Sequence, residues 1–145
     1  LYDCSDPPFR GTGAAQLFDP GTGGFSFTGR MQSCVSLYTA SLLTNGKVLF
    51  NGDPGGWEGW GFIGDAELYD PAAGTFASIG KTIGTRDASL STQLPDGTVL
   101  ITGGQWVANG HPGAELYTPT TATFALTGSM NAGRFGAYPD RTSTC

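Results

Sequence analysis

Two glycine-rich loops contain all three tryptophans of the chain, together with several polar side chains. The first loop runs from Asp53 to Asp65 and the second from Gln105 to Gly113. An indole face stacks on the apolar face of a sugar while carboxylates and amides bond its hydroxyls, and the same side chains suit protein interfaces. Loop packing is an equally good interpretation of each tryptophan taken alone. The predicted ligand-binding residues are Trp57, Glu58, Trp60, Trp106, Asn109 and His111.

Other groups that could do chemistry are few. His111 is the only histidine, and a hydrogen-bonded loop histidine is a commoner role than a ligand. Asp53, Glu58 and Asp65 could gather around Ca²⁺ or supply an acid pair for glycoside cleavage. No EF-hand spacing is present, and such a pair needs a set separation that a sequence does not reveal. No GxSxG nucleophile motif occurs. We therefore predict a non-enzymatic protein with no cofactor and no metal.

The three cysteines are Cys4, Cys34 and Cys145. Their spacing fits no zinc pattern, and a small buried hydrophobe is the commonest role of any single cysteine. Export would permit one disulfide and leave the third thiol unpaired, so the pairing stays open. Few lysines and many Thr, Ser and Gly residues favour an extracellular location, secreted or at the cell surface.

The composition is that of one turn-rich β domain. The 145 residues include 24 glycines, 13% are charged and 12% are aromatic. The net charge is -5 with no basic cluster, which argues against nucleic acid as a partner. No apolar run approaches the roughly 20 residues of a membrane-spanning helix. The chain begins at Leu1, and we expect it to be a processed or excised piece, so a missing export signal says little.

One eleven-residue phrase occurs three times. "AELYDPAAGTF" spans Ala66–Phe76, a near copy spans Ala114–Phe124 and a looser one spans Ala15–Phe25. The copies start 51 (66 − 15) and 48 (114 − 66) residues apart. A period near 50 predicts a repeat architecture.

The alignment extends well beyond this phrase. Thr28–Gly52 aligns without a gap with Ile79–Gly103, and a third copy begins at Thr127. Each repeat is predicted to form four short strands, of which the phrase supplies the third, a turn and the start of the fourth. Asn45-Gly46 and Asp96-Gly97 occupy the same predicted hairpin turn, because both pairs tolerate positive φ. Four antiparallel strands per period is the composition of a propeller blade.

These motifs resemble the kelch repeat of bacterial exported and galactose-oxidase-like propellers. The resemblance is carried by "TVLITGG", which ends in Gly103-Gly104, and by Tyr69 and Tyr117 in the repeated phrase. The first repeat departs from the pattern, with Gly52-Asp53 for the glycine pair and Phe18 for the tyrosine. The fold implied is an all-β, partial β-propeller of four-stranded antiparallel kelch blades. A small β-sandwich is the rival interpretation, and the gapless alignment disfavours it.

The chain is predicted to be a single propeller segment of about three blades. Its blade pieces are expected at about residues 1–27, 36–76, 88–126 and 134–145. Closed propellers use about 4–8 blades, and an open arc would expose blade faces and strand edges. We expect further blades or other protein chains, identical or not, to complete the segment. Contacts between copies that fail to close a ring would build a filament.

The predicted topology places the two long loops on one rim, available to glycans or proteins, and the tight turns on the opposite side. Arg86 and Arg134 occupy equivalent positions at the start of a first strand, where structural bonds are expected. Glu67 and Glu115 are also equivalent, with Gln16 in the first copy. Recurrence at one repeat position indicates architecture rather than a single catalytic site.

The alternative function is a fragment of a copper radical oxidase that resembles galactose or glyoxal oxidase. The resemblance implies a site of two histidines, two tyrosines and a cysteine crosslinked to one tyrosine. A chain with one histidine does not contain that full site. Cys34 and Tyr38 are present, and nothing in the sequence ties them to it.

Overall fold

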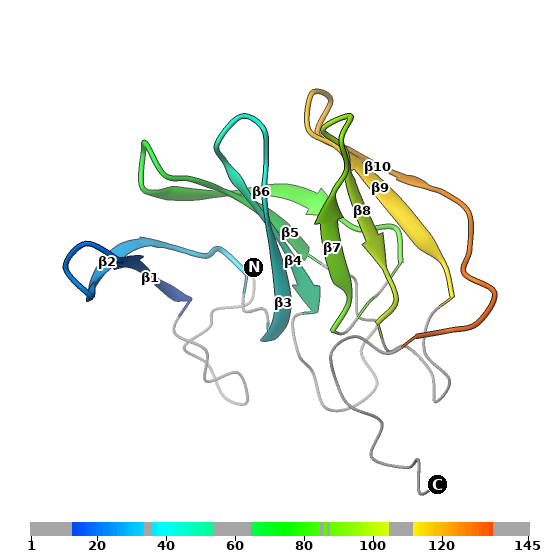
Figure 1. Cartoon of the computed structure of the whole chain (residues 1–145), viewed down its shortest axis with the longest axis horizontal. Helices are drawn as coiled ribbons and strands as arrows, with labels where there is room; N and C mark the ends of the chain where they lie inside the picture. The colour runs from blue at the N-terminus through cyan, green and yellow to red at the C-terminus, as the bar shows by residue number, and fades with distance from the viewer. Residues whose placement is uncertain are drawn as a thin grey trace, which may run out of the picture.

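The computed structural model describes residues 13–33, 36–53, 65–84, 86, 88–104 and 112–134. Within these ranges all regular structure is β, with ten strands in three antiparallel sheets (Figure 1). The predicted all-β class with four-stranded antiparallel sheets is confirmed. No helix in this part of the chain has the length and apolar character needed to cross a membrane.

The three sheets follow one another along the chain. The first sheet has two strands, β1 (Ala14–Asp19) and β2 (Gly24–Arg30). The second has the order β3 (Ser36–Leu42), β4 (Val48–Asp53), β5 (Asp65–Asp70), β6 (Thr75–Lys81). The third has the sequential order β7 (Leu90–Gln93), β8 (Val99–Thr102), β9 (Ala114–Thr118), β10 (Thr123–Leu126). Figure 1 shows them side by side.

The short turns form where the sequence supplies residues that tolerate positive φ. Gly46 and Gly97, between the first and second strands of their sheets, have φ of 80° and 86°. In each turn the glycine amide donates to a leucine carbonyl three residues earlier. The tight turns of the two four-stranded sheets lie on the upper side in Figure 1. The strands therefore reverse direction sharply there and over short distances.

The last two strands of each sheet pair in the same register. Phe18 faces Phe25, Tyr69 faces Phe76, and Tyr117 faces Phe124. The residue two positions before the aromatic residue on β1, β5 or β9 also has an equivalent partner in each sheet. These pairs are Gln16–Phe27, Glu67–Ser78 and Glu115–Leu126. Equivalent positions can therefore be compared from sheet to sheet.

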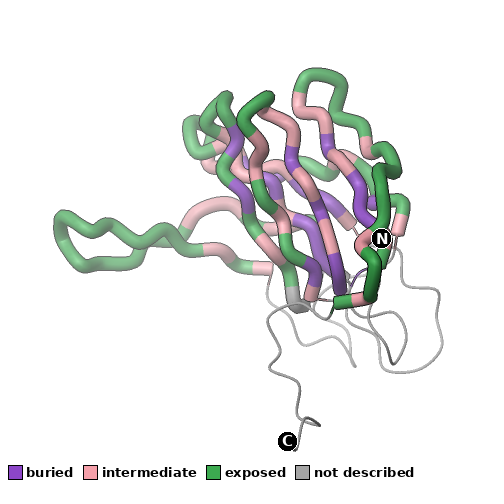
Figure 2. Tube along the Cα trace, turned by 45° about the vertical axis from the view of Figure 1, so that its right-hand side comes forward, coloured by how far each residue is buried: buried purple, intermediate pink, exposed green. Residues whose placement is uncertain are grey.

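The hydrophobic core lies between the second and third sheets. Leu49 from β4 packs with Val99 and Ile101 from β8 and with Tyr117 from β9, each 0% exposed. Successive strand residues point to opposite faces, so each sheet has a leading face toward the preceding sheet and a trailing face toward the following one. Figure 2 shows the buried positions running along the strands of these two sheets.

Hydroxyl and amide groups join the first strands of the two four-stranded sheets. The Ser91 hydroxyl lies 3.0 Å from the Thr39 hydroxyl and 2.6 Å from that of Ser41. The Asn51 side-chain amide donates to the Ser89 hydroxyl at 3.2 Å. The hydroxyl contacts join β3 and β7, and the Asn51–Ser89 bond joins β4 to the residue just before β7.

Candidate functional site

The predicted ligand-binding residues all lie outside the described part of the chain. They are Trp57, Glu58, Trp60, Trp106, Asn109 and His111. Cys4, Cys34 and Cys145 lie outside it too, so the aromatic rim and the disulfide stay predictions. Among the described residues, no group of three or more His, Cys, Asp or Glu side chains could hold a metal ion.

Besides Asp53 at the end of β4, the second described member of the three carboxylates considered for calcium or glycan chemistry is Asp65. Its side chain is partly buried at the start of β5. Desolvation raises the pKa of Asp65 above the ordinary value, the nearby Lys81 charge opposes that rise, and Glu67 adds to it. A carboxyl held this way is easier to protonate than a free aspartate.

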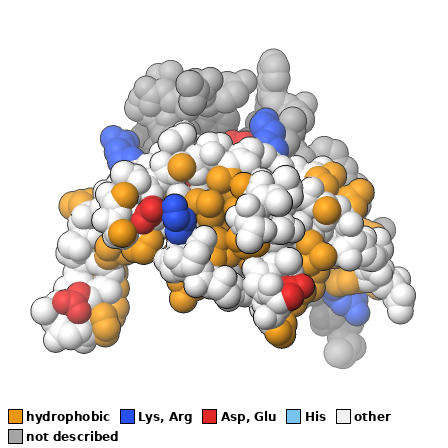
Figure 3. Space-filling view, turned by 90° about the horizontal axis from the view of Figure 1, so that it is seen from above, with side chains coloured by type: hydrophobic (Ala, Val, Ile, Leu, Met, Phe, Trp, Pro, Cys, Tyr) orange, Lys and Arg blue, Asp and Glu red, His pale blue; other side chains and the backbone are white. Residues whose placement is uncertain are grey.

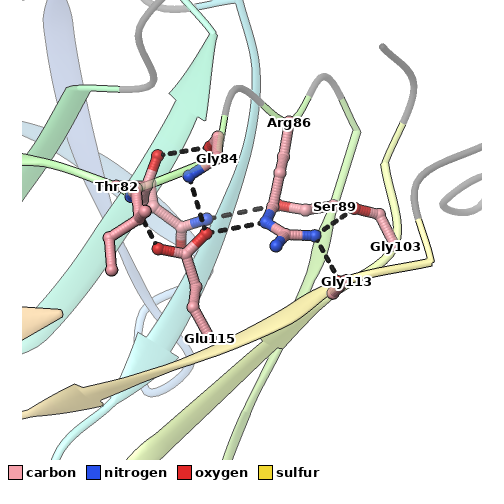
Figure 4. A network of polar contacts seen from close by, with 9 residues as sticks. Thr82, Gly84, Arg86, Ser89, Gly103, Gly113 and Glu115 are labelled. Atoms are coloured by element: carbon pink, nitrogen blue, oxygen red, sulfur yellow. Dashed lines mark hydrogen bonds and ion pairs between the residues drawn. The ribbon is translucent and has the colours of Figure 1, made fainter. Parts of the chain in front are cut away.

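The most highly organised polar site is built around Glu115 of β9 (Figure 4). One carboxylate oxygen accepts the Arg86 Nε–H at 2.7 Å and the Gly84 amide at 3.3 Å, and the other accepts the Ile83 amide at 2.7 Å. The side chains of Arg86 and Glu115 are 2% and 0% exposed. A buried carboxylate is stable only when its charge is paired and its lone pairs are bonded, and this site meets both needs.

Arg86 also binds the backbone of its own sheet. Its Nη1 donates to the carbonyls of Gly103, at 3.1 Å, and Gly113, at 2.6 Å, which lie next to β8 and β9. Thr82 closes the preceding turn, with its hydroxyl donating to the Gly84 carbonyl at 2.9 Å. The structural bonds expected for this arginine are confirmed. The guanidinium fixes where the chain enters the third sheet.

Glu67 of β5 makes equivalent hydrogen bonds at the second sheet. Its carboxylate accepts the amides of Gln32, at 2.9 Å, and Ser33, at 2.7 Å, and also the Ser33 hydroxyl. Glu67 is 1% exposed. We call residues 30–33, 81–84 and 129–132 the linkers, because each begins at or after the end of the last strand of its sheet, at an equivalent position of the repeat. In both described joints a third-strand glutamate binds the linker that arrives from the preceding sheet.

Comparisons with known proteins bear on the fold. No protein-family model matches this chain, and no curated protein does. A solved structure of a fungal alcohol oxidase of the AA5 family, in complex with copper, is similar with a TM-score of 0.58. The two are 17% identical, and the match covers 79% of this chain and 24% of that one. At this identity the likeness concerns the fold alone.

The chain is a partial β-propeller. Two of its sheets are four-stranded antiparallel blades, and the two-stranded first sheet pairs in the register of their third and fourth strands. The chain spans about a quarter of the length of the solved structure that it matches. That the blades are of the kelch type stays a prediction.

The leading face of the first blade is apolar and exposed. Phe18, Phe25 and Phe27 are 55%, 68% and 77% exposed, whereas Tyr69 and Phe76, at the first two positions in the second blade, are 4% and 7% exposed. Figure 2 shows the β1–β2 hairpin extending away from the four-stranded blades, exposed along most of its length. The difference arises because β5 and β6 have a preceding blade against them.

The trailing face of the third blade is also uncovered within the described chain. Leu90 is 54% exposed and Leu100 is half-buried, whereas Leu49, the counterpart of Leu100, is 0% exposed. In the continuous apolar run Val99, Leu100 and Ile101, only Val99 and Ile101, on the leading face, are buried. Seen from the turn side in Figure 3, apolar side chains gather in patches and charged ones are scattered.

The sequence identified Glu67 and Glu115 as equivalent residues but did not show which groups they bind. The recurrence of Glu67 and Glu115 indicated architecture, which their burial between blades supports. Their linker partners were not foreseen. The signal that could have found the ion pair is the joint recurrence, with a period of about 50, of an arginine ahead of the first strand and a glutamate on the third.

Proposed function

We propose that this chain is a non-enzymatic binding and assembly module that acts outside the cell. It serves as a propeller segment that further blades or partner chains complete, while the loops with Trp57 and Trp106 bind glycans or proteins. The observation that carries the assembly role is the exposure of Phe18 and Phe25, whose equivalents in the second blade, Tyr69 and Phe76, are 4% and 7% exposed.

The physical argument concerns apolar area. Fully burying one phenylalanine side chain contributes about 1.5–3 kcal/mol, so burial of Phe18 and Phe25 is a strong driving force for association. The first blade covers the corresponding face of the second blade. The Tyr69 hydroxyl lies 2.7 Å from the Thr28 hydroxyl across this joint. A surface that repeats an internal interface is suited to another blade.

Light scattering over a range of protein concentrations tests the assembly role. We expect particle masses above the 15.0 kDa of one chain. Phe27→Ser is the control, because Ser78, at its position in the second blade, is exposed. The test variant is Phe25→Ser, whose equivalent Phe76 is 7% exposed. It should weaken association at least tenfold and leave the circular dichroism spectrum unchanged. A stable monomer at every concentration, unaffected by the variant, would overturn the self-assembly role.

A glycan array tests the loop role separately. The wild-type chain and the variants Trp57→Ala and Trp106→Ala should differ, with each variant losing bound glycans because a stacking face is removed. Glycan binding that survives both changes would remove the sugar platform from the proposal.

A second candidate is a piece of an oxidase-like propeller, and the similarity to the AA5 alcohol oxidase favours it. The residues at hand do not fit a complete copper site of the predicted kind. The chain has one histidine, His111, and the described residues form no group of metal ligands. Further blades would therefore have to supply ligands. Alcohol oxidation by this chain after addition of copper would replace the non-enzymatic proposal with this one.

A further inference from the structure

We propose that the trailing end of this chain is a docking site for a further blade that carries a carboxylate on its third strand. Arg134 and the amides of Asn131 and Ala132 receive that carboxylate. The inference rests on the proposed assembly function and gives it a specific chemical determinant. The occupant is a blade with a glutamate or aspartate at the position of Glu67 and Glu115.

The two internal joints define the rule. In the first, the amides of Gln32 and Ser33 donate to Glu67. In the second, the amides of Ile83 and Gly84 donate to Glu115, and Arg86 adds its charge. In both, two successive linker amides and one carboxylate from the following blade make the joint.

The third linker has the same construction up to the point where a following blade would bind. Its first hydrogen bond, from the Met130 amide to the Pro112 carbonyl at 2.8 Å, repeats the bond from Met31 to Gly13 at 2.9 Å. Asn131 and Ala132 then hold the places of the two donating amides, and both are exposed. Neither amide makes a hydrogen bond within the part of the chain that the structure describes.

Arg134 holds the place of Arg86 and has no comparable partner among the residues that the structure describes. The two described salt bridges are Lys47–Asp70 and Arg86–Glu115, and the Arg134 side chain is exposed. Its backbone is already in place beside the third blade, since a Cβ added at Gly103 would lie 3.0 Å from the Arg134 carbonyl oxygen. In the second joint an arginine and two linker amides receive a carboxylate. Arg134, Asn131 and Ala132 occupy the same three positions in the repeat.

The charge decides between a foreign blade and a second copy of this chain. A second copy docking head to tail would offer Gln16, the residue that aligns with Glu67 and Glu115. A neutral amide provides no counter-charge for Arg134 and half the acceptor oxygens of a carboxylate. The apolar part of the face, with Leu90 54% exposed, suits either occupant. The site therefore selects a blade with a third-strand acid.

The first test inserts a second copy of residues 87–134 directly after Arg134 in the full chain. The insertion adds one blade, in which the copied Glu115 meets Arg134. We expect the amides of Asn131 and Ala132 to exchange hydrogen about 10- to 100-fold more slowly than in the natural chain, the range for bonds to a charged group. Arg134→Met, or glutamine at the copied glutamate, should abolish this protection, whereas the surface control Lys81→Met should not.

Unchanged amide exchange in a folded, extended chain would overturn the inference and leave the assembly proposal standing. Should the extended chain fail to fold, Gln16→Glu in the natural chain provides the second test. It supplies the acid through a second copy, so head-to-tail association should strengthen about tenfold or more and depend on Arg134. Association that Gln16→Glu leaves unchanged, or that persists equally in Arg134→Met, would also overturn the inference.

Discussion

Ile79→Thr is expected to stabilise the chain, because it restores a hydrogen bond that one blade joint has and the other lacks. In the first joint, the Tyr69 hydroxyl lies 2.7 Å from the Thr28 hydroxyl. In the second, Tyr117 is 0% exposed, and within the described chain its hydroxyl has no hydrogen-bond partner. Ile79 aligns with Thr28 and packs against the core that contains Tyr117.

The magnitude follows from two opposing terms. A buried hydroxyl without a partner costs about 1–3 kcal/mol, which a well-placed threonine hydroxyl would recover. Ile79 is half-buried, and its shortening to threonine loses roughly 1 kcal/mol of apolar burial. The expected net gain in the free energy of unfolding is therefore about 1 kcal/mol. Thr28→Val should cost about 1–3 kcal/mol, because it leaves the Tyr69 hydroxyl without its partner.

Urea unfolding of four proteins measures the coupling: wild type, Ile79→Thr, Tyr117→Phe and the double variant. Tyr117→Phe should be neutral or stabilising in the wild type, since it removes an unpaired hydroxyl, and should cost about 1 kcal/mol in the Ile79→Thr background. Burial also raises the pKa of Tyr117, so alkaline titration should show this tyrosine ionising late. No coupling between the two sites, or a large loss from Tyr117→Phe alone, would refute the reasoning.

Three further predictions concern the turns and the ion pair. Ala122, at φ 53°, aligns with Gly74, at φ 65°; Ala122→Gly should raise the free energy of unfolding by up to about 1 kcal/mol and Gly74→Ala should lower it, measured by urea unfolding. The hydrogen bond with Lys47 is the chief cause that lowers the pKa of Asp70 below its ordinary value of 3.8. The stabilisation that ionised Asp70 contributes is therefore present above pH 3.8 and is lost as the pH falls through the folded-state pKa. The difference in the free energy of unfolding between wild type and Lys47→Met should shrink below that pH. Arg86→Met should cost about 3–5 kcal/mol, because it leaves Glu115 buried and unpaired, and a loss under 1 kcal/mol by thermal or urea unfolding would contradict this.

Local chemistry in the sequence determined the strands and turns. Gly46 and Gly97 predicted the tight turns. The repeated phrase that includes Leu68 and Tyr69 predicted that the third and fourth strands are joined by a turn and pair with each other. These features depend on residues within about ten positions of one another, where alternation and turn propensity act directly. The antiparallel four-stranded sheets could therefore be predicted from the sequence alone.

The joints between blades were decided by the tertiary structure. Glu115 meets Arg86 across 29 residues of sequence, and Tyr69 meets Thr28 across 41. Such contacts depend on how one sheet packs on the next, and period and alternation carry no direct record of that packing. The repeat marked Glu115 and Arg134 as equivalent to other residues in the chain. Only the packed blades show that one is a satisfied, buried anion and the other an exposed cation after the last described strand.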